Sequence, residues 1–122
     1  MIDDSIVRGT TAIKIVEMVR EAEASEVHMR VSSPPIKFPD YYGIDTPKKE
    51  DLIASSNTIK EIEKKLNLDS LHFLSIKGLY KSMGYPDRDA KSPQFTDHCF
   101  TGDYPVDVKE LLNVEDLKVG AK

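Results

Sequence analysis

Residues 2–11 read IDDSIVRGTT, and this stretch decides to which fold class the chain belongs. An apolar start leads directly into two carboxylates, Asp3 and Asp4, as at the carboxyl end of a buried strand. After a short loop, apolar residues recur at three- and four-residue spacing, which predicts a helix that begins near Thr10. The apolar stripe of this helix consists of Ala12, Ile15, Val16, Val19 and Ala22.

A second strand is predicted after the helix. Residues 27–31 alternate apolar and polar side chains, which is the period of a strand with one buried face. Strand, helix and strand in this order form a βαβ unit, so the two strands should lie parallel in an α/β fold. Because a parallel sheet needs further strands and cover on both faces, we expect the chain to begin in the middle of a domain.

Two helices are predicted between residues 36 and 67. Thr46 followed by Pro47 is typical of a helix start, and a short helix should continue through residues 52–53. Thr58 and Glu61 have the spacing of a capping box, which begins the second helix. The second helix has an apolar face of Ile59, Ile62 and Leu66, and Asn67 can end it.

A short strand, one more helix and a polar end are predicted in the rest of the chain. Residues 71–74 suit the strand, after which Ser75 caps a helix that Gly84 ends. The apolar face of this helix holds Ile76, Leu79, Tyr80 and Met83. Residues 94–105 are expected to be irregular. The end of the chain is charged.

The composition is that of one globular domain. The 122 residues carry 17 Lys and Arg against 21 Asp and Glu, and the resulting net charge of -4 argues against binding to nucleic acid. No run of eighteen apolar residues predicts a membrane span, and no basic start followed by an apolar stretch predicts a secretory signal. We therefore expect a cytoplasmic protein that binds no membrane.

The chain has one cysteine, Cys99, so an internal disulfide is excluded. A lone thiol holds neither zinc nor an iron–sulfur cluster by itself, and a free cysteine is most often a small buried apolar residue. His98 precedes it, but neighbouring side chains on an extended segment point to opposite faces. The sequence therefore does not favour a catalytic Cys–His pair.

The loop at residues 3–11 carries the clearest chemistry. Adjacent carboxylates at the end of a parallel strand can accept hydrogen bonds from ribose hydroxyls or bind Mg²⁺. Gly9 allows the backbone to approach an anion, and the amides and hydroxyls of Thr10 and Thr11 can donate to it. Taken alone, an Asp-Asp pair before a helix is more often a turn former and cap. A P-loop lysine and the other glycines of a dinucleotide-binding fingerprint are absent.

The loop closely resembles the phosphoribosyl pyrophosphate (PRPP) loop of type I phosphoribosyltransferases, and specifically that of glutamine PRPP amidotransferases. Further stretches resemble the carboxyl-terminal region of that family in the same order, so the resemblance covers about residues 1–105. These stretches are residues 26–35, 42–47, 69–71, 74–75 and 100–105. The resemblance implies a partial phosphoribosyltransferase core at residues 1–35, a mostly helical region at 36–105 and a charged tail at 106–122.

The resemblance also implies a role for each loop residue. Asp3 and Asp4 would bind the ribose hydroxyls of PRPP and Mg²⁺. The 5-phosphate would lie against Ser5, Arg8, Gly9, Thr10 and Thr11. In the family the same pocket accepts the purine mononucleotides AMP and GMP as inhibitors, so these residues would serve regulation as well as catalysis.

In this family an amino-terminal cysteine hydrolyses glutamine, and the ammonia reacts with PRPP to give 5-phosphoribosylamine in de novo purine synthesis. Here residue 1 is Met, residue 2 is Ile, and the single cysteine is Cys99. The resemblance therefore implies a carboxyl-terminal portion of a glycosyltransferase and glutamine amidotransferase that is inactive alone. The alternative is a non-catalytic nucleotide-binding or assembly module, docked on full-length subunits or in a homo-oligomer.

Some members of the family hold an iron–sulfur cluster with cysteines in this region. The corresponding positions here are Asp40, Thr96 and Cys99, so one of three expected thiols is present and we expect no cluster. Asp40 and Thr96 are then expected to be surface or turn residues, with Cys99 a buried remnant. His28 and Arg30 could face either packed helices or the site, and a structural role is the more common of the two.

Overall fold

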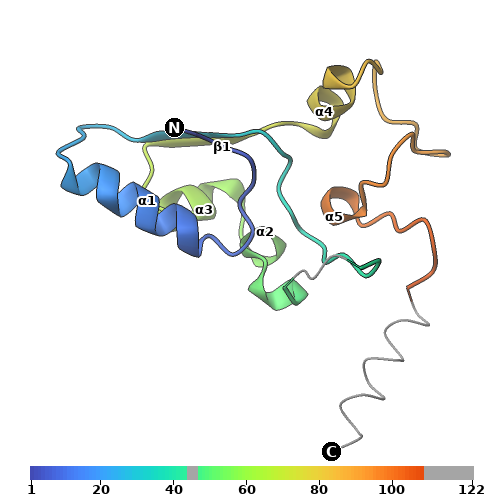
Figure 1. Cartoon of the computed structure of the whole chain (residues 1–122), viewed down its shortest axis with the longest axis horizontal. Coiled ribbons are helices and arrows are strands. Elements are labelled where there is room, and N and C mark those ends of the chain that lie inside the picture. The colour runs from blue at the N-terminus through green and yellow to red at the C-terminus, as the bar shows by residue number, and fades with distance from the viewer. Residues whose placement is uncertain (44–46, 109–122) are drawn as a thin grey trace, which may run out of the picture.

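The computed structural model describes residues 1–43 and 47–108 (Figure 1). Within these ranges, three strands form one sheet in the order β1-β2-β3. None of the helices in these two ranges is long and apolar enough to cross a membrane. The elements are β1 (Ile2–Asp3), α1 (Thr10–Glu21), β2 (His28–Val31), the 3₁₀ helix η1 (Lys49–Asp51), α2 (Ile53–Ser56), α3 (Ile59–Lys65), β3 (Ser70–Phe73), α4 (Ile76–Ser82) and α5 (His98–Thr101).

The predicted βαβ unit is confirmed. Strands β1 and β2 pair in parallel, with Asp3 opposite Val31, and α1 connects them. The Ser32 amide donates to the Asp3 carbonyl at 2.9 Å, so the pairing continues to the end of β1. Asp3 therefore lies at the carboxyl edge of the sheet, from which the chain enters the loop that leads to α1.

Strand β3 extends the same sheet. It pairs in parallel with β2, with Met29 opposite Leu71, and α3 lies in the connection between them. The strand expected at residues 71–74 is thus present, displaced by one residue. A domain boundary after residue 35 stays a prediction, although the sheet itself takes its third strand from beyond that position.

The core lies on one face of the sheet, where α1 and α3 pack (Figure 1). Each fully buried large apolar side chain contributes about 1.5–3 kcal/mol to folding. The opposite face of β2 exposes His28 and Arg30, which confirms the alternating pattern and places neither side chain against a packed helix. The buried side chains of this core cluster are Ile6, Ala12, Val16, Val27, Met29, Val31, Ala54, Ile62, Leu66, Leu68 and Leu71.

Some residues that the sequence placed on the apolar faces of α1 and α3 are exposed in the structure. In α1, Ile15 is 36% exposed and Ile13 packs against the core in its place, because the stripe is centred on Ala12 and Val16. The helix ends at Glu21, so Ala22 falls at its exposed cap. In α3, Ile59 is 42% exposed, and Ile62 and Leu66 alone carry the buried face that the sequence predicted.

Several predicted helix ends are confirmed. Both hydrogen bonds of the Thr58–Glu61 capping box are present. Ser75 accepts a hydrogen bond from the Gly78 amide at 2.9 Å and begins α4, and Gly84 has the expected left-handed backbone, with φ of 90°. On the apolar face of α4, Tyr80 is fully buried whereas Met83, at the helix cap, is exposed.

The prediction of one helix running through residues 52–53 is wrong. Leu52 has an extended backbone, with φ of -77° and ψ of 115°, and separates η1 from α2. Because its side chain is fully buried, the chain bends to insert it into the core. The predicted cap residue Thr46 lies outside the described residues. The region expected to be irregular, residues 94–105, contains the short helix α5.

A buried ionic network ties the segment around α5 to α4. Arg88 donates to both carboxylate oxygens of Asp97, at 2.6 and 3.2 Å, and also to Asp103 at 2.5 Å. The Tyr80 hydroxyl donates to the same Asp97 carboxylate at 2.8 Å, and the Thr101 hydroxyl donates to it at 3.1 Å. The Asp97 side chain is 4% exposed, so its charge depends on these partners.

We predict that Asp97→Asn lowers the free energy of unfolding by about 3 kcal/mol, because it leaves the Arg88 guanidinium with incomplete compensation. Urea denaturation at neutral pH measures the change. Asp87→Asn is the matched control, since Asp87 pairs with Lys77 at 3.4 Å where both side chains are more than half exposed. An equal loss in the two variants would contradict a special role for the buried network.

The network also predicts a pH dependence. Burial raises the pKa of Asp97, but hydrogen bonds from Arg88, Tyr80 and Thr101 outweigh it, and the net pKa lies below its ordinary value of 3.8. The stability contribution of the carboxylate is therefore complete above the unfolded pKa and is lost as the pH falls through the folded one. The stability difference between the parent and Asp97→Asn should stay constant from about pH 7 to pH 5 and narrow below about pH 4. A difference that persists unchanged in acid would contradict this assignment.

Candidate functional site

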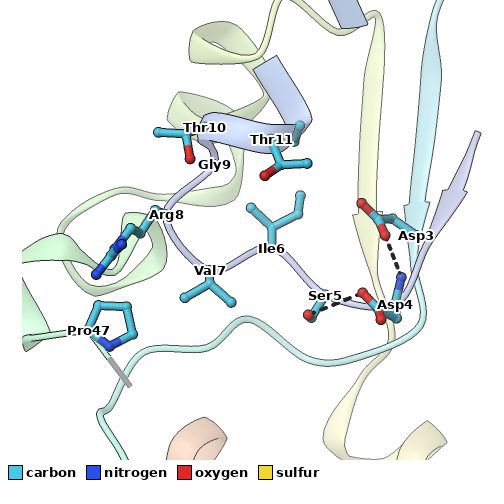
Figure 2. Close-up of a pocket in the computed structure, with 11 residues that line it drawn as sticks. Asp3, Asp4, Ser5, Ile6, Val7, Arg8, Gly9, Thr10, Thr11 and Pro47 are labelled. Carbon is cyan, nitrogen blue, oxygen red and sulfur yellow. Dashed lines mark hydrogen bonds between the residues drawn. The ribbon is translucent and has the colours of Figure 1, made fainter. Parts of the chain in front are cut away.

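A cavity of about 520 Å³ opens between the carboxyl end of β1 and the start of α1 (Figure 2). All seven residues that the sequence assigned to a ligand site line this one cavity, together with four that it did not. The lining residues are Asp3, Asp4, Ser5, Ile6, Val7, Arg8, Gly9, Thr10, Thr11, Ala12 and Pro47.

The carboxylates lie on one side of the cavity. The Asp4 amide donates to Oδ1 of Asp3 at 2.9 Å, and the Ser5 hydroxyl donates to Oδ1 of Asp4 at 3.3 Å. Asp3 thus does hold the turn, as the simpler interpretation of an Asp-Asp pair expects. Within the described part of the chain, no hydrogen bond engages the second oxygen of either carboxylate, which leaves these atoms available to a ligand.

Two apolar residues fix the middle of the loop. Ile6 is 3% exposed and belongs to the hydrophobic core, and the Val7 carbonyl accepts a hydrogen bond from the Ile53 amide at 3.0 Å. The sequence analysis missed this anchor, although a pair of apolar residues within a polar loop is a signal for it. Because the middle is held, the polar residues at the two ends of the loop have defined positions.

The other side of the cavity is the N-terminus of α1. Gly9 is the N-cap, with φ of 84°, and a Cβ at this position would lie 2.8 Å from Cδ1 of Ile53. Among the described residues, no side chain caps the amides of the first turn, and this turn contains no acidic residue. The uncapped N–H groups and the positive end of the helix dipole therefore attract an anion.

Three further polar side chains border this end. The hydroxyls of Thr10 and Thr11 lie at the start of the helix, and the Arg8 side chain extends toward Pro47 (Figure 2). All three side chains are exposed to solvent. The cavity thus has carboxylates at one end and hydrogen-bond donors at the other, an arrangement that complements a molecule carrying hydroxyl groups and a phosphate.

A second polar cluster was not expected from the sequence. Asp40, predicted to be a surface or turn residue, is buried and forms a hydrogen bond with Nε2 of His98. His98 and Cys99 belong to α5, so the rule for extended segments does not apply to them. Burial, and then the charge of Asp40, raise the pKa of the partly buried Cys99 thiol. Thr96 is exposed, as expected.

Known proteins resemble the chain closely, although no family model matches it. The chain is 58% identical to the amidophosphoribosyltransferase of Rhizobium etli, with 100% of this chain and 24% of that protein covered. It is 52% identical to the amidophosphoribosyltransferase of Bacillus subtilis, with 88% of this chain and 22% of that protein covered. The chain therefore spans about a quarter of the length of these relatives.

The fold is shared as well. The glutamine PRPP amidotransferase from B. subtilis, solved in complex with ADP and GMP, matches with a TM-score of 0.78 at 51% identity, over 90% of this chain and 24% of that one. The parallel sheet and its helices are thus a partial α/β phosphoribosyltransferase fold, as expected. By sequence and by fold, the chain belongs to the amidophosphoribosyltransferases and matches a carboxyl-terminal portion of them.

Proposed function

We propose that the chain supplies the PRPP-binding loop of an amidophosphoribosyltransferase. The observation that carries this proposal is that the carboxylates of Asp3 and Asp4 and the uncapped N-terminus of α1 line one cavity. The carboxylates would accept hydrogen bonds from the ribose hydroxyls, and the donors at the helix start would bind the 5-phosphate. The volume of about 520 Å³ suits a phosphorylated sugar or a mononucleotide.

Mg²⁺ is the cofactor that this donor set fits. Magnesium prefers oxygen ligands and is commonly held by one or two carboxylates together with water and substrate phosphate oxygens. Asp3 and Asp4 offer such carboxylates at an open edge of the sheet, so they would hold the ion. When bound, Mg²⁺ would neutralise part of the pyrophosphate charge as that group leaves.

The same loop would serve regulation. The related B. subtilis enzyme was solved in complex with ADP and GMP. A purine mononucleotide such as AMP or GMP carries the same ribose 5-phosphate unit as PRPP, so it would compete for Asp3, Asp4 and the start of α1.

The complete reaction forms 5-phosphoribosylamine in purine synthesis and also needs a glutaminase. The one cysteine among these 122 residues is Cys99, in the short helix α5, and it does not match the amino-terminal nucleophile of a glutaminase. We infer that the chain binds its ligand but is inactive by itself. The cytoplasmic location and the association with full-length subunits or further copies stay predictions.

Calorimetric titration with PRPP and Mg²⁺ tests the carboxylate end. We expect the double variant Asp3→Asn/Asp4→Asn to bind roughly a hundredfold more weakly, because charged hydrogen bonds to the ribose are lost. The control Glu17→Gln/Glu21→Gln changes the net charge equally at two exposed positions of α1 and should bind as the parent does. A parent chain that binds neither PRPP nor AMP would instead support a purely structural assembly module.

A pair of glycine variants tests the phosphate end. Gly9→Ala and Gly84→Ala both place a side chain on a left-handed backbone, with φ of 84° and 90°, so each should lose at least about 1 kcal/mol of stability, and Gly9→Ala loses more where its Cβ meets Ile53. Gly9→Ala alone should weaken the binding of ribose 5-phosphate, roughly tenfold or more, because the added Cβ forces the loop or the end of the Ile53 side chain to shift beside the phosphate position. Equal affinities in the two variants would contradict the proposed phosphate position.

A further inference from the structure

A cluster of three potential metal ligands lies outside the loop site. Asp40, in the segment after β2, meets His98 and Cys99 of α5, and one ligand atom from each residue lies within 4.8 Å of the others. The side chains of Asp40 and His98 are 4% and 9% exposed. We propose that these three residues bind one divalent transition-metal ion of the zinc type, with water as a further ligand.

The chemistry of the three donors selects the class of metal. A carboxylate oxygen, an imidazole nitrogen and a thiolate sulfur together form a ligand set that suits Zn²⁺ and Co²⁺. Mg²⁺ and Ca²⁺ prefer oxygen ligands alone, and an iron–sulfur cluster usually needs four thiolates. The mixed set therefore differs in kind both from the Mg²⁺ site proposed at Asp3 and Asp4 and from a cluster site.

The separation of the ligand atoms is close to that of a metal site. Ligands around tetrahedral zinc, with bonds of about 2.0–2.3 Å, lie about 3.5 Å apart. The widest of the present separations, up to 4.8 Å, would have to close by roughly 1 Å, whereas Asp40 and His98 are hydrogen-bonded directly to each other and would have to move apart to admit the ion. The backbone around the cluster is already held, because the amides of Lys37 and Phe38 both donate to the Cys99 carbonyl, at 3.0 and 3.1 Å.

The His98 imidazole is held in a defined orientation beside Asp40. Its Nε2 faces Asp40, while its Nδ1 is buried and has no hydrogen-bond partner among residues 1–43 and 47–108. An ion shared with Asp40 would bind through Nε2 and would leave Nδ1 to an ordered water. The rings of Tyr42 and Tyr104, 4.9 and 5.1 Å from the His98 ring, confine the imidazole between them.

A cavity of about 380 Å³ adjoins the cluster and provides room for the water ligand. Asp40 and His98 both border it, so a metal bound between them would be open to solvent on this side. The cavity is lined by Asp40, Tyr42, Thr96, His98, Pro105 and Val106. A metal here would link the segment after β2 to α5, two parts of the chain that are 58 residues apart. Cys99 would bind as thiolate, with its proton released to water.

Titration of the metal-free chain with Co²⁺ tests this proposal. We expect one Co²⁺ per chain, a sulfur-to-cobalt charge-transfer band in the near ultraviolet, displacement by Zn²⁺ but not by Mg²⁺, and a higher melting temperature with Zn²⁺. Cys99→Ser should abolish the band, and His98→Gln should weaken binding roughly tenfold or more. His28→Gln, which removes an exposed histidine beside Glu26, is the control and should bind as the parent does.

An unchanged band in Cys99→Ser, or no band in the parent, would overturn the proposal. Zinc X-ray absorption of the parent provides a measurement that does not depend on the folding of any variant. It should show one sulfur at about 2.3 Å together with nitrogen or oxygen ligands at about 2.0–2.1 Å. A spectrum without sulfur would show that Zn²⁺ binds elsewhere, and the proposal would then be wrong.

Discussion

The parallel pairing of β1 with β2 is the constraint on which the rest of the structure depends. Two parallel strands need a crossover, and α1 provides it by packing Ala12 and Val16 against the core face of the sheet. The helix must then begin at the edge where β1 ends. This geometry brings the carboxylate of Asp3 and the uncapped amides of α1 to opposite sides of one loop, whatever ligand the loop binds.

The core and the loop support each other. Ile6 is buried in the same cluster as the inward side chains of β2 and β3, so folding of the sheet also positions the loop. Two features favour glycine at position 9: the backbone there is left-handed, and it lies close to the Ile53 side chain. Because Ile53 also donates its amide to the Val7 carbonyl, α2 acts as a support for the loop rather than as an independent element.

Among the described residues after β3, buried polar interactions accompany the apolar and aromatic contacts. The Asp97 carboxylate joins Arg88, Tyr80 and Thr101, and Asp40 meets His98 across a large separation in sequence. Such buried groups are stable only with their partners in place. The irregular segments around α5 therefore depend on side-chain contacts more than on a regular backbone ladder.

The sequence by itself determined the βαβ unit, the caps at Thr58 and Ser75, and the gathering of charged and hydroxyl residues in the loop. These features follow from local spacing and backbone preference, which neighbouring residues express without help from the rest of the fold. Only the tertiary structure decided that β3 joins the sheet, that Leu52 breaks a helix and that Asp40 is buried beside His98. Each of these depends on residues far apart in the chain, whose contacts leave no periodic signal in a single sequence.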